Sequence, residues 1–186
     1  MKKDFFVLAI SAILVCSCSK KPTEPPIVPQ LNTTFKFIGN GTFVEWNGYS
    51  DPASYPIAQG SSIQKYNYNG STYYMIVAHP AGAGLNTPAI YLKLETNNLT
   101  PGTYTKTLTA PVLWTLADNE CIMPGASGIH GTTSQVGDYV TVIITSTHDN
   151  VYADGTFTAL MTNSGQGTAT KLTITNGEFH NVKITQ

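Results

Sequence analysis

Short alternating runs of apolar and polar residues, separated by turn residues, fill the chain from Thr33 onward. Threonine and tyrosine supply many of the polar positions, and both suit a pleated, half-buried surface while being poor helix formers. No stretch of this region repeats its apolar residues with helical spacing. The pattern therefore predicts an all-β fold, a single antiparallel β-sandwich of about eight to ten strands over residues 32–186.

The first predicted hairpin turns at Asn40-Gly41, because both residue types tolerate the positive φ of a two-residue turn. A shift of one residue would exchange the two faces, so the register can be checked against the hydrophobic pattern. The turn creates one apolar face and one charged face through these opposed partners: Phe35 and Trp46, Phe37 and Val44, Lys36 and Glu45.

A second hairpin is predicted around Asn69-Gly70, with Tyr66 opposite Tyr73 and Tyr68 on the same face. Ile63, Ile76 and Tyr74 fall on the other face. Three tyrosines on one face would form a flat aromatic patch with hydroxyls at its edge, a surface that stacks on sugar rings. The alternative is that another sheet or the 47–60 loop covers this patch.

The last fifty residues show the clearest sheet pattern. Residues 138–147 place Ile143 on an otherwise polar face, which predicts a central strand covered on both sides. Asn176-Gly177 is predicted to turn into a final strand, Glu178 to Thr185. Val182 and Ile184 return to the core face only if one extra residue is inserted, so we expect a β-bulge near His180-Asn181.

The N-terminus has the features of an export signal. Lys2 and Lys3 precede an apolar run over residues 5–15, which is shorter than the roughly 20 residues that span a bilayer. The following Val15-Cys16-Ser17-Cys18 resembles the lipobox of bacterial lipoproteins, and the resemblance implies lipid attachment at Cys18. An ordinary signal peptide cleaved nearby is the alternative.

Three segments follow from this interpretation: a signal peptide (1–17), a lipidated Cys18 with a proline-rich tether (18–31), and the β-sandwich domain (32–186). Proline favours extended polyproline II, so the tether is a semi-rigid spacer. At about 3.1 Å per residue, it would hold the domain roughly 40 Å from the membrane.

Charge excludes some partners. The formal net charge is −1, and all ten positive residues are lysines. Nucleic-acid binding needs a basic face, so no nucleic-acid partner is expected. The absence of arginine removes the usual bidentate group for phosphate or carboxylate ligands, which favours neutral ligands.

Metal and catalytic sites have weak signals. Cys121 remains as the one cysteine of the predicted domain, so it cannot form an internal disulfide, and we interpret it as a small buried hydrophobe. Cys121 with His130 is the pair to check for a metal or a hydrolase site. Residues 148–155 faintly resemble a calcium loop but fit an Asx-rich hairpin connection better. We therefore expect no metal, no cofactor and no catalytic residues.

The C-terminal motifs are "G-T-F-x-A" at Gly155–Ala159 and "I-T-N-G-E-F-x-N-V" at Ile174–Val182, expected as a closing hairpin. With the lipobox, they resemble small uncharacterised all-β lipoproteins of Bacteroidota outer membranes. The resemblance implies an exported domain anchored to the outer membrane and brings no catalytic residues. Ser19, Lys20 and Lys21 replace the acidic residues that accompany surface export, so periplasmic and cell-surface orientations both stay open.

The leading functional prediction is a non-catalytic, lipid-anchored envelope protein that binds a neutral glycan or a protein partner, with Tyr66, Tyr68 and Tyr73 as the ligand-binding residues. A structural or assembly component of an envelope complex is the second possibility. A hydrolase with an unrecognised site is the third. An exposed aromatic face would favour the first, and a sealed sandwich with an unpaired, self-complementary edge strand would favour the second. A cleft with two acids, or Cys121 beside His130, would favour the third.

Overall fold

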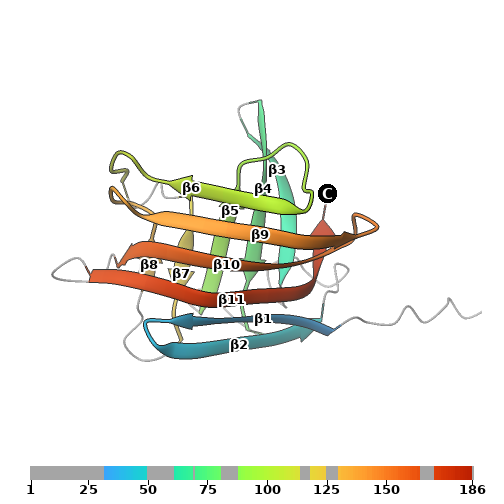
Figure 1. Ribbon diagram of the computed structural model, residues 1–186, viewed down its shortest axis with the longest axis horizontal. Helices are drawn as coiled ribbons and strands as arrows, with labels where there is room; N and C mark the ends of the chain where they lie inside the picture. The colour runs from blue at the N-terminus through green and yellow to red at the C-terminus, as the bar shows by residue number, and fades with distance from the viewer. Residues whose placement is uncertain are drawn as a thin grey trace, which may run out of the picture.

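The computed structural model describes residues 32–49, 61–68, 70–80, 88–113, 118–124, 130–163 and 170–185, and within them the side chains of residues 32, 47–49, 68, 130 and 163 are not described. The predicted signal peptide and tether, with Cys18, lie outside these ranges. The described chain forms eleven strands (Figure 1): β1 Asn32–Gly39, β2 Thr42–Tyr49, β3 Ser62–Tyr68, β4 Ser71–Ala78, β5 Ala89–Leu94, β6 Gly102–Thr107, β7 Glu120–Ile122, β8 His130–Thr132, β9 Tyr139–His148, β10 Tyr152–Asn163 and β11 Thr170–Thr185.

The prediction of an all-β fold is confirmed. The order of the strands in the sheet was not predicted from the sequence. One layer has the order β2-β1-β11-β10-β9-β6, and the other has β3-β4-β5-β7-β8. Figure 1 shows the second layer crossing behind the first at a steep angle. The layers are joined into a single sheet where β11 pairs with β3 and where β8 pairs with β10. The β11–β3 pairing is parallel, so the sheet is not wholly antiparallel.

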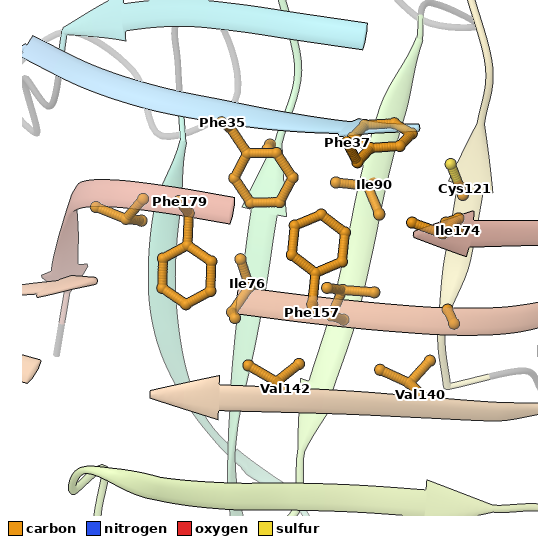
Figure 2. Packing of buried hydrophobic residues seen from close by; sticks show 14 of the residues in the cluster. Phe35, Phe37, Ile76, Ile90, Cys121, Val140, Val142, Phe157, Ile174 and Phe179 are labelled. Carbon is orange, nitrogen blue, oxygen red and sulfur yellow. The ribbon is translucent and has the colours of Figure 1, made fainter. Parts of the chain in front are cut away.

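Aromatic side chains fill the space between the layers. Figure 2 shows the rings of Phe35, Phe157 and Phe179 facing Ile76 and Ile90 of the other layer. Phe35 is fully buried, and its ring centroid lies 4.9 Å from that of Phe157. Burying one such side chain contributes about 1.5–3 kcal/mol to stability. This shared core holds the two layers together.

The first hairpin has the predicted register, with Phe35 opposite Trp46 and Lys36 opposite Glu45. Asn40 and Gly41 both have positive φ, 46° and 82°, as a two-residue turn requires. The ion pair of Lys36, however, is made to β11, where its Nζ lies 2.9 Å from Glu178 Oε2. The hydrogen bond and the charge of Glu178 raise the pKa of Lys36.

The C-terminal prediction was right about the bulge and wrong about the turn. Asp154 faces two residues of β11, His180 and Asn181, between the paired positions 153–182 and 155–179, and Asn181 has a φ of 52°. This is the expected bulge. The Asn176-Gly177 turn does not form, because β11 runs unbroken from Thr170 to Thr185. Asn176 has a φ of 51° but Gly177 does not have a positive φ, so this pair forms a second bulge.

A further difference concerns β9, which was expected to be covered on both sides. The outer face of β9 is not covered within the described residues, where Ile143 is 39% exposed.

Asp138 is fully buried, and its carboxylate accepts hydrogen bonds from Thr162 and Lys171. Burial opposes its ionised form, but the hydrogen bonds prevail and hold its pKa below the usual range. Asp138 thus ties the turn before β9 to β10 and β11.

No helix among the described residues has the length and apolar character needed to cross a membrane.

Candidate functional site

The predicted pairing of Tyr66 and Tyr73 is present on the outer face of the β3–β4 hairpin. Their rings are stacked, with centroids 5.3 Å apart and planes 13° from parallel. Tyr66 is 39% exposed, and its hydroxyl donates a hydrogen bond to Gln64 Oε1. Tyr68 continues this strand opposite Ser71, although its side chain is not described. The two rings therefore stack against each other, and the wider patch that includes Tyr68 stays a prediction.

Strand β5 places a cation, Lys93, next to the aromatic stack. Lys93 pairs with Met75, and its Nζ lies 4.7 Å from the centroid of the Tyr73 ring. A lysine at this distance over an aromatic face makes a cation–π interaction. Tyr91 lies on the same outer face, where burial, Glu120 and Tyr66 raise its pKa. The order across three strands is thus Tyr66, Tyr73 and Lys93.

A network of two lysines and two carboxylates adjoins the stack. Lys93 Nζ lies 2.9 Å from Asp118 Oδ1 and 3.8 Å from Glu95 Oε1. Lys106 comes from β6 in the other layer, and its Nζ lies 2.5 Å from Glu95 Oε1 and also bonds Asp118. The charges alternate in sign and sum to zero. The network links β5 to the end strand of the opposite layer.

The lysines determine the protonation of Asp118. Burial opposes its ionised form, but hydrogen bonds from Lys106 and Lys93 outweigh this and hold its pKa below the usual range. Glycoside hydrolysis needs one carboxylic acid with a raised pKa as proton donor. Asp118 has the opposite shift, so it does not fit the role of that general acid.

The stack and the network border an open cleft. A first hollow of about 610 Å³ lies between Gly70–Tyr73 and a second wall formed by Lys93, Glu95, Thr96 and Asn97. A second hollow of about 260 Å³ lies between Lys93–Glu95 and residues 103–106 of β6. Ligand clefts commonly have volumes of about 300–1,000 Å³. The lining offers two aromatic side chains, Tyr73 in the first hollow and Tyr104 in the second, beside hydroxyl, amide and ionic groups.

The network of lysines and carboxylates was not predicted from the sequence, because its members come from separate strands and a connecting segment. One local signal was available. In Tyr91-Leu-Lys-Leu-Glu95, strand alternation places Tyr91, Lys93 and Glu95 on one face. Pairing β5 beside β4 would have brought that face next to Tyr73.

The described residues do not bring the other candidate sites together. Cys121 is fully buried, and burial and Glu120 raise its pKa to about 12, so it is not a reactive thiolate. Its register partner is Gly131, whereas His130 pairs with Ile122. Asp149 and Asn150 have positive φ in the turn of the β9–β10 hairpin, as expected for an Asx-rich connection. No group of three or more potential metal ligands occurs within the described residues.

Comparison with known proteins does not assign this site. No protein-family model, no characterised protein sequence and no solved structure shows significant similarity to the chain. A proposal for the function of the cleft therefore depends on its geometry.

Proposed function

We propose that the protein is a non-catalytic, lipid-anchored envelope protein whose outer cleft binds a neutral glycan. The observation that carries the proposal is the cleft beside Tyr73, where one aromatic ring lies among hydroxyl groups, an amide and the paired charges of Lys93 and Glu95. Sugar rings present apolar C–H faces and many hydroxyls, so they match an amphipathic aromatic ring next to hydrogen-bonding side chains. The exposed ring of Tyr66 extends the aromatic surface.

The balance of charge supports a neutral ligand. Lys93 and Lys106 are each bonded to carboxylates, so neither is a free cation for an anionic ligand. Their ion pairs also position the groups of the cleft before any ligand arrives. Such preorganisation reduces the entropy lost on binding.

Substituting both Tyr66 and Tyr73 by alanine tests the proposal. We expect the double variant of the full chain, in detergent, to lose retention on an array of neutral glycans. Its melting temperature should change little, because both rings lie outside the core. Tyr139→Ala is the matched control. Tyr139 is the first residue of β9 and does not line the cleft, so this variant should retain binding. Equal glycan retention by the double variant and the unaltered protein would refute this function.

The anchor is tested separately at Cys18. Cys18→Ser should release the protein from the membrane fraction, because the proposed lipid attachment needs the thiol. Mass spectrometry of the mature N-terminus should find an acylated cysteine in the unaltered protein. An unacylated N-terminus would remove the anchor from the proposal and leave the cleft unaffected. The same fractionation places the anchored protein in the outer or the inner membrane.

A protein partner is the second candidate, because β2 is a free edge of the described sheet and carries Phe43, which is 60% exposed. Free edge strands are sites where another chain can add a strand. Phe43→Lys should then abolish envelope-protein capture without changing glycan retention, which separates this candidate from the first.

A further inference from the structure

The two hollows of the cleft adjoin each other, because they share part of their lining. Lys93 and Glu95 line both of them. The first hollow extends from these residues toward Tyr73 on β4, and the second extends toward Thr103 and Thr105 on β6. A ligand that fills both must therefore be extended and must cross the Lys93–Glu95 pair.

The second hollow is bounded by an unpaired strand edge. β6 pairs with β9 along one side, from Gly102 opposite Ile144 to Thr107 opposite Tyr139. It is the last strand of its layer, and its other side has no strand partner within the described residues. Alternate backbone N–H and C=O groups along that side therefore lack a strand partner among the described residues and can bond hydroxyl groups. A linear sugar chain presents hydroxyls on every unit, so it can use this edge repeatedly.

Lys106 limits how the edge can be used. Its side chain leaves β6 and bonds Glu95 and Asp118 of the opposite layer. The edge is therefore bridged by side chains, and the remaining space is a hollow of about 260 Å³. A peptide added as a further strand would need a continuous edge and pockets for its alternate side chains. The hollow is bridged, and it is lined by hydroxyl groups and by the paired charges of Lys93, Glu95 and Lys106, which favours a sugar chain over a peptide strand.

We infer that the cleft holds an extended segment of a linear, uncharged polysaccharide in two connected subsites, the first at Tyr73 and the second along the free edge of β6. The inference rests on the proposed glycan-binding function and adds the length and shape of the ligand. Lys93 and Glu95 lie at the junction of the subsites, where their polar groups face the linkage between sugar units.

Chain-length dependence tests the inference. Calorimetric titration of the full chain in detergent would use linear gluco- and manno-oligosaccharides, from disaccharide to hexasaccharide. We expect the affinity for at least one series to rise by about tenfold once the chain reaches the second subsite, which corresponds to about 1.4 kcal/mol. Thr103→Trp, which fills the second hollow, should reduce the affinity for long chains to that for short ones. Thr158→Trp, on β10 away from the cleft, is the matched control and should bind like the unaltered protein.

The outcomes separate the inference from the function on which it rests. Binding that is lost with Tyr73→Ala but does not depend on chain length would overturn the second subsite and keep the proposed function. Binding of no oligosaccharide in either series, with the protein folded by circular dichroism, would overturn both. Tighter binding of an extended threonine-rich peptide than of any oligosaccharide, lost with Thr103→Trp, would assign the edge to a peptide partner instead.

Discussion

Two Asn-Gly pairs with the same sequence have different structures in this protein. Asn40-Gly41 connects β1 to β2 as a tight turn, and both residues have positive φ. Asn176-Gly177 lies inside β11, where only the asparagine has positive φ and the chain continues as a bulged strand. The first pair is exposed, whereas Gly177 is buried beneath Phe157.

The difference shows how tertiary contacts select among local conformations. An Asn-Gly pair permits a two-residue turn because both residues tolerate positive φ. At β11, pairing on both sides opposes the reversal, because β10 and β1 bond to this part of the strand along its two edges. The glycine then serves a second purpose, the close approach of an aromatic ring to the backbone. Substituting each glycine tests whether the two are required for these different reasons.

Gly177→Ala should have the largest effect. A Cβ at this position would lie 2.5 Å from the backbone oxygen of Phe157 and 2.6 Å from its ring. Overpacking of this kind costs about 1–3 kcal/mol, and we expect the upper end because one contact is to backbone. Urea denaturation of the full chain in detergent should show the lower midpoint. Asn176→Gly is the control and should be nearly neutral, since glycine readily adopts a φ of 51°.

Gly41→Ala should have a smaller effect with a different origin. No atom lies within 4 Å of a Cβ built at Gly41, so the cost is due to its φ of 82° alone. An L-residue in this conformation loses about 1–2 kcal/mol, and we expect the lower value at an exposed turn. Gly41→Asn should recover much of that loss, because asparagine tolerates positive φ. If Gly41→Ala proved as costly as Gly177→Ala in the same denaturation series, the distinction between the two glycines would be wrong.

The same distinction explains how far the sequence predicts the fold. Local patterns were sufficient where both partners belong to one hairpin, as for Phe35 with Trp46 and for Tyr66 with Tyr73. The bulge at Asn181 was also predictable, because the apolar period of β11 changes there. The continuous β11 and its parallel pairing with β3 depend on strands distant in the sequence.

The candidate site, like the fold, could be predicted from the sequence only in part. The tyrosine pair was found from one hairpin, but its stacked geometry and Lys93 required the neighbouring strand. Lys106 could not be connected to Glu95 or Asp118 without knowing that the end strand β6 meets the segments after β5 and before β7 across the two layers. No sequence pattern encodes that meeting, because it follows from the packing of the two layers on a shared core.

Acidification should have the smallest effect on stability. It should weaken the bulge in β11 and leave the tight turn between β1 and β2 unchanged. Asp154 Oδ1 accepts a hydrogen bond of 2.7 Å from the backbone N–H of Asn181, whereas the backbone N–H of Asn40 donates to the carbonyl oxygen of Thr173. Burial opposes the ionised form of Asp154, but hydrogen bonds from Asn181, Ser146 and His148 hold its pKa below the usual range. Its folded pKa is therefore the lower one, so its stabilisation is complete above about pH 4, the ordinary aspartate range, and is lost as the pH falls toward that lower value.

Amide hydrogen exchange at decreasing pH measures this difference, once corrected for the intrinsic pH dependence of exchange. Protection at Asn181 should fall by about 1 kcal/mol in the acid range, the usual contribution of one hydrogen bond, while protection at Asn40 stays constant. Asp154→Asn keeps an acceptor oxygen but removes the titration, so its Asn181 protection should no longer depend on Asp154 ionisation. Parallel loss of protection at Asn40 and Asn181 would mean that acid weakens the whole sheet, and that the bulge is not held by its own carboxylate.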